Sequence, residues 1–229
     1  INSFWLLPNL YFITTGGGIV GQSKIQALFT EEAFAQNASF GTLPDLLIFK
    51  NFLFNWSQYI GNNTFGPVLS NWTNHLNEPF VLLLGYFYSA VALIGVVYSI
   101  IKKNKITVVF ISILSICFFF WFNINPPLGF VFSFLQARIP FFEEAVRFPF
   151  TKFSILLTFA VSFYFAWGLL FFIELVRKIK PNRIFAPLLS LFILITLIYY
   201  MLPAFKGDFL DPYMRVNIPK EYFSMFKWF

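Results

Sequence analysis

Long apolar runs dominate the pattern of hydrophobic and polar positions along this chain. Four of them reach the length of about 20 residues that an α-helix needs to cross a bilayer. They cover residues 80–101, 106–122, 153–175 and 184–204, and none carries a charge near its middle. The pattern therefore predicts an all-α fold: a polytopic transmembrane helix bundle with four complete spans within residues 79–204.

The flanking segments extend this prediction. Residues 1–15 begin with an apolar stretch too short to span, so we interpret them as the end of a preceding transmembrane helix. Residues 16–78 form a long external loop, in which residues 43–56 combine an early Pro with an interrupted apolar stripe and predict an interfacial helix. We expect residues 205–229 to start an extracytoplasmic region. Because the chain begins without Met and ends abruptly, we interpret it as a fragment of a larger protein.

Basic residues predict the orientation. Loops 102–105 and 177–183 contain seven Lys or Arg residues and no acidic residue. Since Lys and Arg in short loops are retained on the cytoplasmic side, we expect both loops in the cytoplasm and segment 123–152 outside. Glu174 lies three and four residues before Arg177 and Lys178, which predicts a local ion pair.

Composition agrees with a membrane environment. Of 229 residues, 58% are hydrophobic and 11% charged, and the mean hydropathy is +0.71, whereas a soluble domain carries about 25% charged residues. The net charge of +6 comes from basic clusters beside apolar runs, which is typical of topology signals rather than of a nucleic-acid surface. The lone Cys117 lies inside an apolar run and is expected to be a small buried residue.

Other polar residues point to no catalytic or metal site. His75 is the only histidine and is expected to be solvated in the external loop. Solvated loop positions are also the prediction for the external carboxylates Glu31, Glu32, Asp45, Asp208 and Asp211. The sequence contains no Gly-rich phosphate motif and no metal-ligand spacing, so we expect neither a cofactor nor a metal.

Segment 123–152 is the most unusual part of the sequence. Its apolar stretch, residues 128–135, is too short to span and is bounded by prolines, which predicts a re-entrant or interface-parallel piece. Arg138, Arg147 and Lys152 follow. Arg binds phosphate through a two-pronged fork and Lys as a point charge, so these three residues could hold a carrier phosphate or a lipid headgroup.

An alternative reading pairs Glu143 or Glu144 with Arg147 at helical spacing. The ion pair would then anchor the segment at the level of the headgroups. Spacing alone favours this second reading.

Three segments resemble a known family. They are Ile-Pro-Phe-Phe-Glu-Glu-Ala-Val-Arg-Phe-Pro-Phe-Thr-Lys-Phe at 139–153, Asn-Ser-Phe-Trp-Leu-Leu-Pro at 2–8, and Ile-Pro-Lys-Glu-Tyr at 218–222. Their order and expected membrane side are similar to those of the C-type membrane glycosyltransferase superfamily. Within it, the closest likeness is to the polyprenyl-phosphate-sugar-dependent arabinofuranosyltransferases of bacteria and archaea.

The resemblance implies an enzyme of a prokaryotic cytoplasmic membrane that moves a sugar from a polyprenyl-phosphate carrier to an envelope acceptor. Its partners would be membrane lipid and a lipid-linked sugar, with contacts to the carrier phosphate from Arg147 and Lys152. In that family the catalytic carboxylate lies in the first external loop, near the N-terminus of the complete protein. We expect this fragment to lack that loop, so the catalytic residue is unknown.

Two other function classes stay open. A transporter or lipid flippase usually needs charges or broken helices at the membrane midplane, and the four apolar runs contain neither. A non-catalytic membrane scaffold of the same fold is the third reading.

Overall fold

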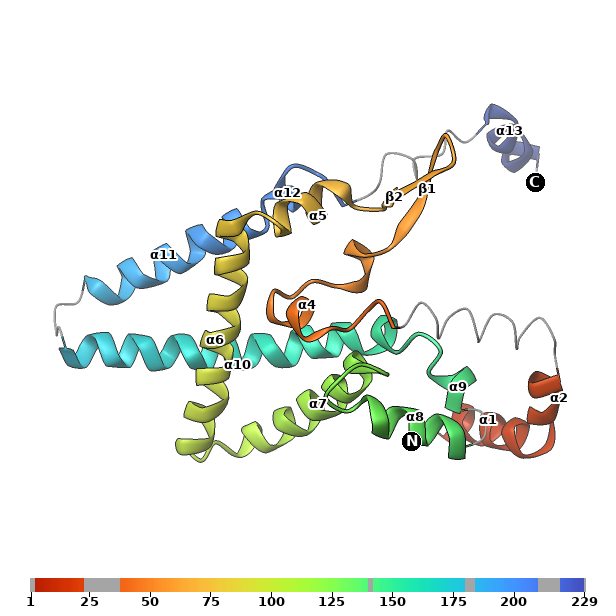
Figure 1. The fold of residues 1–229 in the computed structure, drawn as a ribbon, viewed down its shortest axis with the longest axis horizontal. Coiled ribbons are helices and arrows are strands. Elements are labelled where there is room, and N and C mark those ends of the chain that lie inside the picture. The colour runs from red at the N-terminus through yellow and green to blue at the C-terminus, as the bar shows by residue number, and fades with distance from the viewer. Residues whose placement is uncertain (1–2, 23–37, 140–141, 180–183, 210–218, 229) are drawn as a thin grey trace.

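The computed structural model describes residues 3–22, 38–139, 142–179, 184–209 and 219–228, of which about 75% are helical. Figure 1 shows α10 (Pro149–Ile179) running through the middle of the molecule, crossed by α6 (Pro79–Ile101), and α7 (Lys105–Phe122) also packs on α10. These three helices are long and apolar enough to cross a membrane, which is consistent with membrane association.

The fourth expected span is shorter than predicted. Helix α11 (Phe185–Tyr200) has 16 residues, or about 24 Å at 1.5 Å per residue, against a hydrocarbon core of about 30 Å. A separate turn, α12 (Leu202–Phe205), follows it. Pro203 explains the break, because it lacks the N–H that would bond back to Tyr199 and its ring clashes with the carbonyl group of that residue. Four complete spans are therefore not confirmed.

The third expected span is longer than predicted at both ends. Helix α10 has 31 residues and begins at Pro149, where the fixed φ of proline suits the first helical position. Arg177 and Lys178 lie in its last turn, where positive charge complements the helix dipole. Lys152 is consequently a helical residue rather than part of the external segment expected before the span.

Small residues allow α6 and α10 to pack closely. A Cβ atom added to Gly95 would lie 1.8 Å from the carbonyl oxygen of Tyr164, and one added to Gly168 would lie 2.0 Å from that of Val91. Ser99, one turn after Gly95, is fully buried. Small residues at four-residue spacing are typical of close helix contacts in membranes.

The loop before α6 contains short elements. In chain order they are α4 (Leu43–Leu47), the 3-10 turn η1 (Phe52–Phe54), β1 (Ser57–Gly61), β2 (Thr64–Pro67) and α5 (Ser70–Leu76). The interfacial helix expected over residues 43–56 is thus formed only at its start. It ends early because Phe49 has a left-handed backbone, with φ of 53°.

Strands β1 and β2 form an antiparallel hairpin, so the all-α prediction needs this one correction among the described residues. Asn62 and Asn63 connect the strands with φ of 51° and 55°. Two-residue hairpin turns require positive φ at both positions, and Asn tolerates this conformation better than most residues.

The remaining helices are α1 (Ser3–Thr15), α2 (Gly17–Gln22), α8 (Gly129–Arg138), α9 (Phe142–Ala145) and α13 (Lys220–Trp228). Helix α8 contains most of the apolar stretch expected to be re-entrant or parallel to the interface. Its place relative to a bilayer stays a prediction, as do the membrane sides of loops 102–105 and 177–183.

Candidate functional site: an apolar crevice near two basic residues

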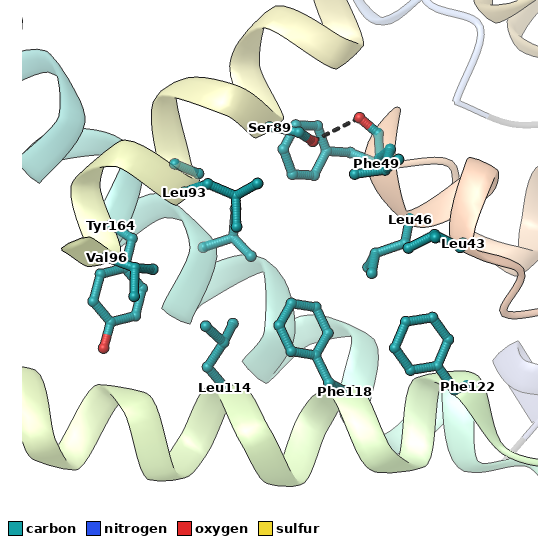
Figure 2. Close-up of a pocket in the computed structure, with 13 residues that line it drawn as sticks. Leu43, Leu46, Phe49, Ser89, Leu93, Val96, Leu114, Phe118, Phe122 and Tyr164 are labelled. Atoms are coloured by element: carbon teal, nitrogen blue, oxygen red, sulfur yellow. Dashed lines mark hydrogen bonds between the residues drawn. The ribbon is translucent and has the colours of Figure 1, made fainter. Parts of the chain in front are cut away.

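An apolar crevice of about 280 Å³ lies among α4, α6, α7 and α10. Figure 2 shows Leu114, Phe118 and Phe122 extending from α7 toward the side of the crevice formed by α6, with Leu43 and Leu46 of α4 at one end. Val161 and Tyr164 of α10 complete the lining. Four helices that are separate in sequence therefore contribute to one apolar surface.

The hydroxyl groups in this lining already have partners within the protein. Ser89 donates from Oγ to the carbonyl oxygen of Leu47 at 2.6 Å (Figure 2). Tyr164 donates from its hydroxyl to the carbonyl oxygen of Thr107 at 3.0 Å. Because a polar ligand group would lose its hydrogen bonds to water here without gaining new ones, the crevice suits an apolar occupant.

Polar contacts attach the segment before α4 to the end of α7. Asn123 is fully buried with φ of 42°, and its side-chain amide donates to the carbonyl oxygen of Phe40 at 3.3 Å. The Asn125 amide donates to the same oxygen at 2.6 Å. Gly41 has φ of 78°, and an added Cβ would lie 2.0 Å from the carbonyl oxygen of Trp121. These contacts hold α4 over the crevice.

A second apolar hollow of about 310 Å³ follows along α6 and shares Leu93 with the crevice. Tyr98, which also lines this hollow, donates from its hydroxyl to Glu174 at 2.6 Å. Lys102 lies 3.4 Å from the same carboxylate oxygen. The ion pair that Glu174 forms is therefore with Lys102 of α6 across the helix interface, whereas Lys178 of the expected local pair acts on the carboxylate through a longer-range charge interaction.

The pKa of the Lys102 ammonium group is raised above its ordinary value. The hydrogen bond with Tyr98 is the largest cause, and the interaction with Glu174 is the next. The positive charge at this end of α6 is thus stabilised by two partners.

Two of the three predicted phosphate-binding residues lie at one junction. Arg147 is half-buried between α9 and α10, and Lys152 in the first turn of α10 donates to the carbonyl oxygen of Ala145. Arg138 is exposed at the end of α8, with its guanidinium group 5.8 Å from the ring centre of Phe134. The side chains of Glu143 and Glu144 lie outside the described residues, so the alternative pairing stays a prediction.

The basic junction lies beyond the Phe122 end of the crevice. Phe153, directly after Lys152, packs against a buried cluster that includes Phe122 and Leu157. Val161 of the crevice lies nine residues after Lys152, which corresponds to about 14 Å along the helix and about half a turn around it. Arg147 and Lys152 therefore lie near the crevice along α10 without lining it.

His75 is buried, with 7% of its surface exposed, so the expectation of a solvated histidine is wrong. Its Nε2 lies 3.0 Å from the carbonyl oxygen of Tyr199, and its Nδ1 lies 3.7 Å from Glu78. The ring contact with Tyr199, at 5.6 Å between ring centres, also covers it. The sequence around His75 could not indicate its burial, because its hydrogen-bond partner lies 124 positions away.

Asp45 also departs from its expected solvated state. It is half-buried, accepts hydrogen bonds from Thr42 and Asn55, and lies 3.7 Å from Lys50. Glu31, Glu32 and Asp211 lie outside the described residues. Cys117 is 1% exposed, as expected of a small buried residue. Within the described part of the chain, no group of three or more His, Cys, Asp or Glu side chains could hold a metal ion.

The fold and the crevice define a mainly helical protein with three helices long and apolar enough to cross a membrane. No family model, curated protein or solved structure matches the chain.

Proposed function

We propose that this protein is the membrane-embedded part of a glycosyltransferase that moves a sugar from a polyprenyl-phosphate carrier to an envelope acceptor. The observation that carries the proposal is the apolar crevice beside α10, beyond one end of which lie Arg147 and Lys152. A polyprenyl phosphate has the matching form, a long apolar chain that ends in an anion.

The two ends of the site have distinct roles in this proposal. The apolar chain lies between α6 and α7, where the lining hydroxyl groups are already paired. The second hollow beyond Leu93 extends the apolar path for a chain longer than the crevice alone can hold. The phosphate group lies near Arg147, whose guanidinium fork suits two phosphate oxygens, with Lys152 adding charge.

The resemblance of segments 2–8, 139–153 and 218–222 to the C-type glycosyltransferases supports the transferase over other proteins that bind lipid phosphates. A second candidate is a non-catalytic scaffold that holds the same lipid. It stays a candidate because no segment of this sequence matches the external loop that carries the catalytic carboxylate in that family.

Binding and transfer are tested separately on the protein in detergent or in nanodiscs. A photoreactive polyprenyl phosphate is expected to label the wild type, and Arg147→Ala is expected to reduce the labelling at least tenfold while membrane insertion stays normal. Leu93→Trp enlarges a side chain that lines both the crevice and the second hollow. It is expected to reduce labelling because it narrows the space for the apolar chain of the lipid. Unchanged labelling of both variants would refute the lipid site.

Arg177→Ala is the matched control, because it removes the same charge from the opposite end of α10. Its labelling is expected to equal that of the wild type. Transfer of a sugar from a labelled polyprenyl-phosphate sugar then distinguishes the two candidates. Labelling with transfer that depends on Arg147 supports the enzyme, and labelling without any transfer favours the scaffold.

A further inference from the structure

A separate cavity of about 270 Å³ lies at the ends of α5 and α12 and has a mainly polar lining. Its polar lining residues are Asn71, Asn74, His75, Glu78, Lys206 and Asp208. It shares no lining residue with the apolar crevice. None of these side chains has a role in the proposed glycosyl transfer.

Long-range hydrogen bonds connect the walls of this cavity. The indole N–H of Trp72 donates to the backbone oxygen of Asp208 at 2.7 Å, which joins α5 to the segment after α12. Nε2 of His75 lies 3.0 Å from the backbone oxygen of Tyr199 at the end of α11. Because both contacts span more than 120 residues, they fix the two walls relative to each other before any ligand binds.

Charges of both signs line the cavity. Glu78 lies 3.7 Å from Nδ1 of His75, accepts a hydrogen bond from the Tyr199 hydroxyl at 3.4 Å, and is half-exposed. The contact of His75 Nε2 with a carbonyl oxygen requires a proton on Nε2, so Nδ1 attracts the carboxylate only when the ring is protonated. Among the described residues, Lys206 and Asp208 form no ion pair.

This lining selects a class of ligand. An anion alone would meet the carboxylates of Glu78 and Asp208, and a metal ion would lack a group of three suitable ligands within the described residues. An apolar ligand would leave the polar walls without partners. A ligand that carries both an ammonium and an anionic group matches both signs of charge with charge-assisted hydrogen bonds.

We propose that this cavity binds a small zwitterion, with its ammonium group against Glu78 and Asp208 and its anionic group against Lys206. The volume is close to the lower limit of roughly 300 Å³ for small-molecule pockets, so the ligand has about the size of phosphoethanolamine. The source is either the free molecule or the headgroup of an ethanolamine lipid. The inference uses no part of the crevice, so it stands independently of the proposed transferase.

Calorimetric titration of the detergent-purified chain tests the free ligand. Phosphoethanolamine is expected to bind saturably and at least tenfold more tightly than inorganic phosphate or ethanolamine alone. Nanodiscs test the lipid source: a spin-labelled phosphatidylethanolamine is expected to associate more strongly than the corresponding phosphatidylglycerol if the headgroup is the ligand. Equal binding of phosphate alone, or no selective binding in either arm, would overturn the inference.

Two substitutions locate the site within the protein. Glu78→Gln and Lys206→Met are each expected to weaken binding at least tenfold. Glu221→Gln and Lys220→Met make the same charge changes on α13, outside the cavity, and are expected to leave binding unchanged. If Glu78→Gln alters the elution profile or the melting temperature, Asp208→Asn replaces it. Normal binding by a folded Lys206→Met variant would contradict the proposed orientation.

Discussion

The crossing of α6 and α10 provides a quantitative test of the fold. In Gly95→Ala the new Cβ would lie 1.8 Å from the carbonyl oxygen of Tyr164 and 2.7 Å from the amide nitrogen of Gly168. Cβ atoms essentially never approach other heavy atoms closer than 3.0 Å, so the helices would have to separate by about 1.2 Å. Both close atoms belong to backbone, and a change of side-chain rotamer cannot relieve the clash.

The expected magnitude follows from two opposing effects. A gap of 0.5–1 Å already removes roughly a quarter to a half of the dispersion attraction between atoms in contact, and overpacking typically costs about 1–3 kcal/mol. Alanine returns up to about 1 kcal/mol through its higher helix propensity. We therefore expect Gly95→Ala to lower the free energy of unfolding by about 2 kcal/mol, and Gly168→Ala to do the same, because its Cβ would lie 2.0 Å from Val91.

The double variant sharpens the test. One separation of the helices relieves both clashes, so Gly95→Ala with Gly168→Ala should cost clearly less than the sum of the single variants. Unfolding by SDS in mixed micelles, followed by tryptophan fluorescence, is a suitable assay because Trp167 of α10 lies against Tyr98 of α6, 6.0 Å between ring centres. Gly18→Ala is the control, since its added Cβ meets no atom within 4 Å. Wild-type stability of both single variants would refute the close crossing.

Two further predictions concern the crevice and the far end of α6. Gly41→Ala combines a left-handed backbone with a Cβ 2.0 Å from the Trp121 carbonyl, and we expect it to lose about 2 kcal/mol or more in the same assay; wild-type stability would contradict the attachment of α4 to α7. Glu174→Gln removes an exposed pair with Lys102, so it should lower the melting temperature slightly at low salt and not at high salt. An equal decrease at both salt concentrations would argue against an ionic contribution.

The long helices could be predicted because their signal is local. The expected runs 80–101 and 106–122 each begin one residue after the start of α6 and α7 and end at the same residue. Pro79 marks the start of the first run, and the Lys and Asn residues of the turn separate it from the second. Asn104 caps α7 by accepting a hydrogen bond from the amide of Ile106 at 2.8 Å. The fourth run was predicted to be too long because its apolar composition was given more weight than Pro203. The effect of this proline on the helix is also local.

The crevice and the polar cavity could not be predicted because the contacts that form them are long-range. Asn123 and Gly41 look like ordinary loop residues, and their importance follows only from the approach of Phe40 to the end of α7, 83 positions away.

The burial of His75 has a long-range cause of the same kind. In a polar segment, the sequence of α5 gives no reason to bury His75, because its acceptor at Tyr199 lies 124 positions further along the chain. Once α5 packs against the end of α11, however, the ring must find a partner for its N–H, and the backbone carbonyl exposed at the end of that helix provides one. A buried histidine in this chain is therefore a consequence of where α11 ends, and Pro203, which determines that end, indirectly determines the shape of the polar cavity as well.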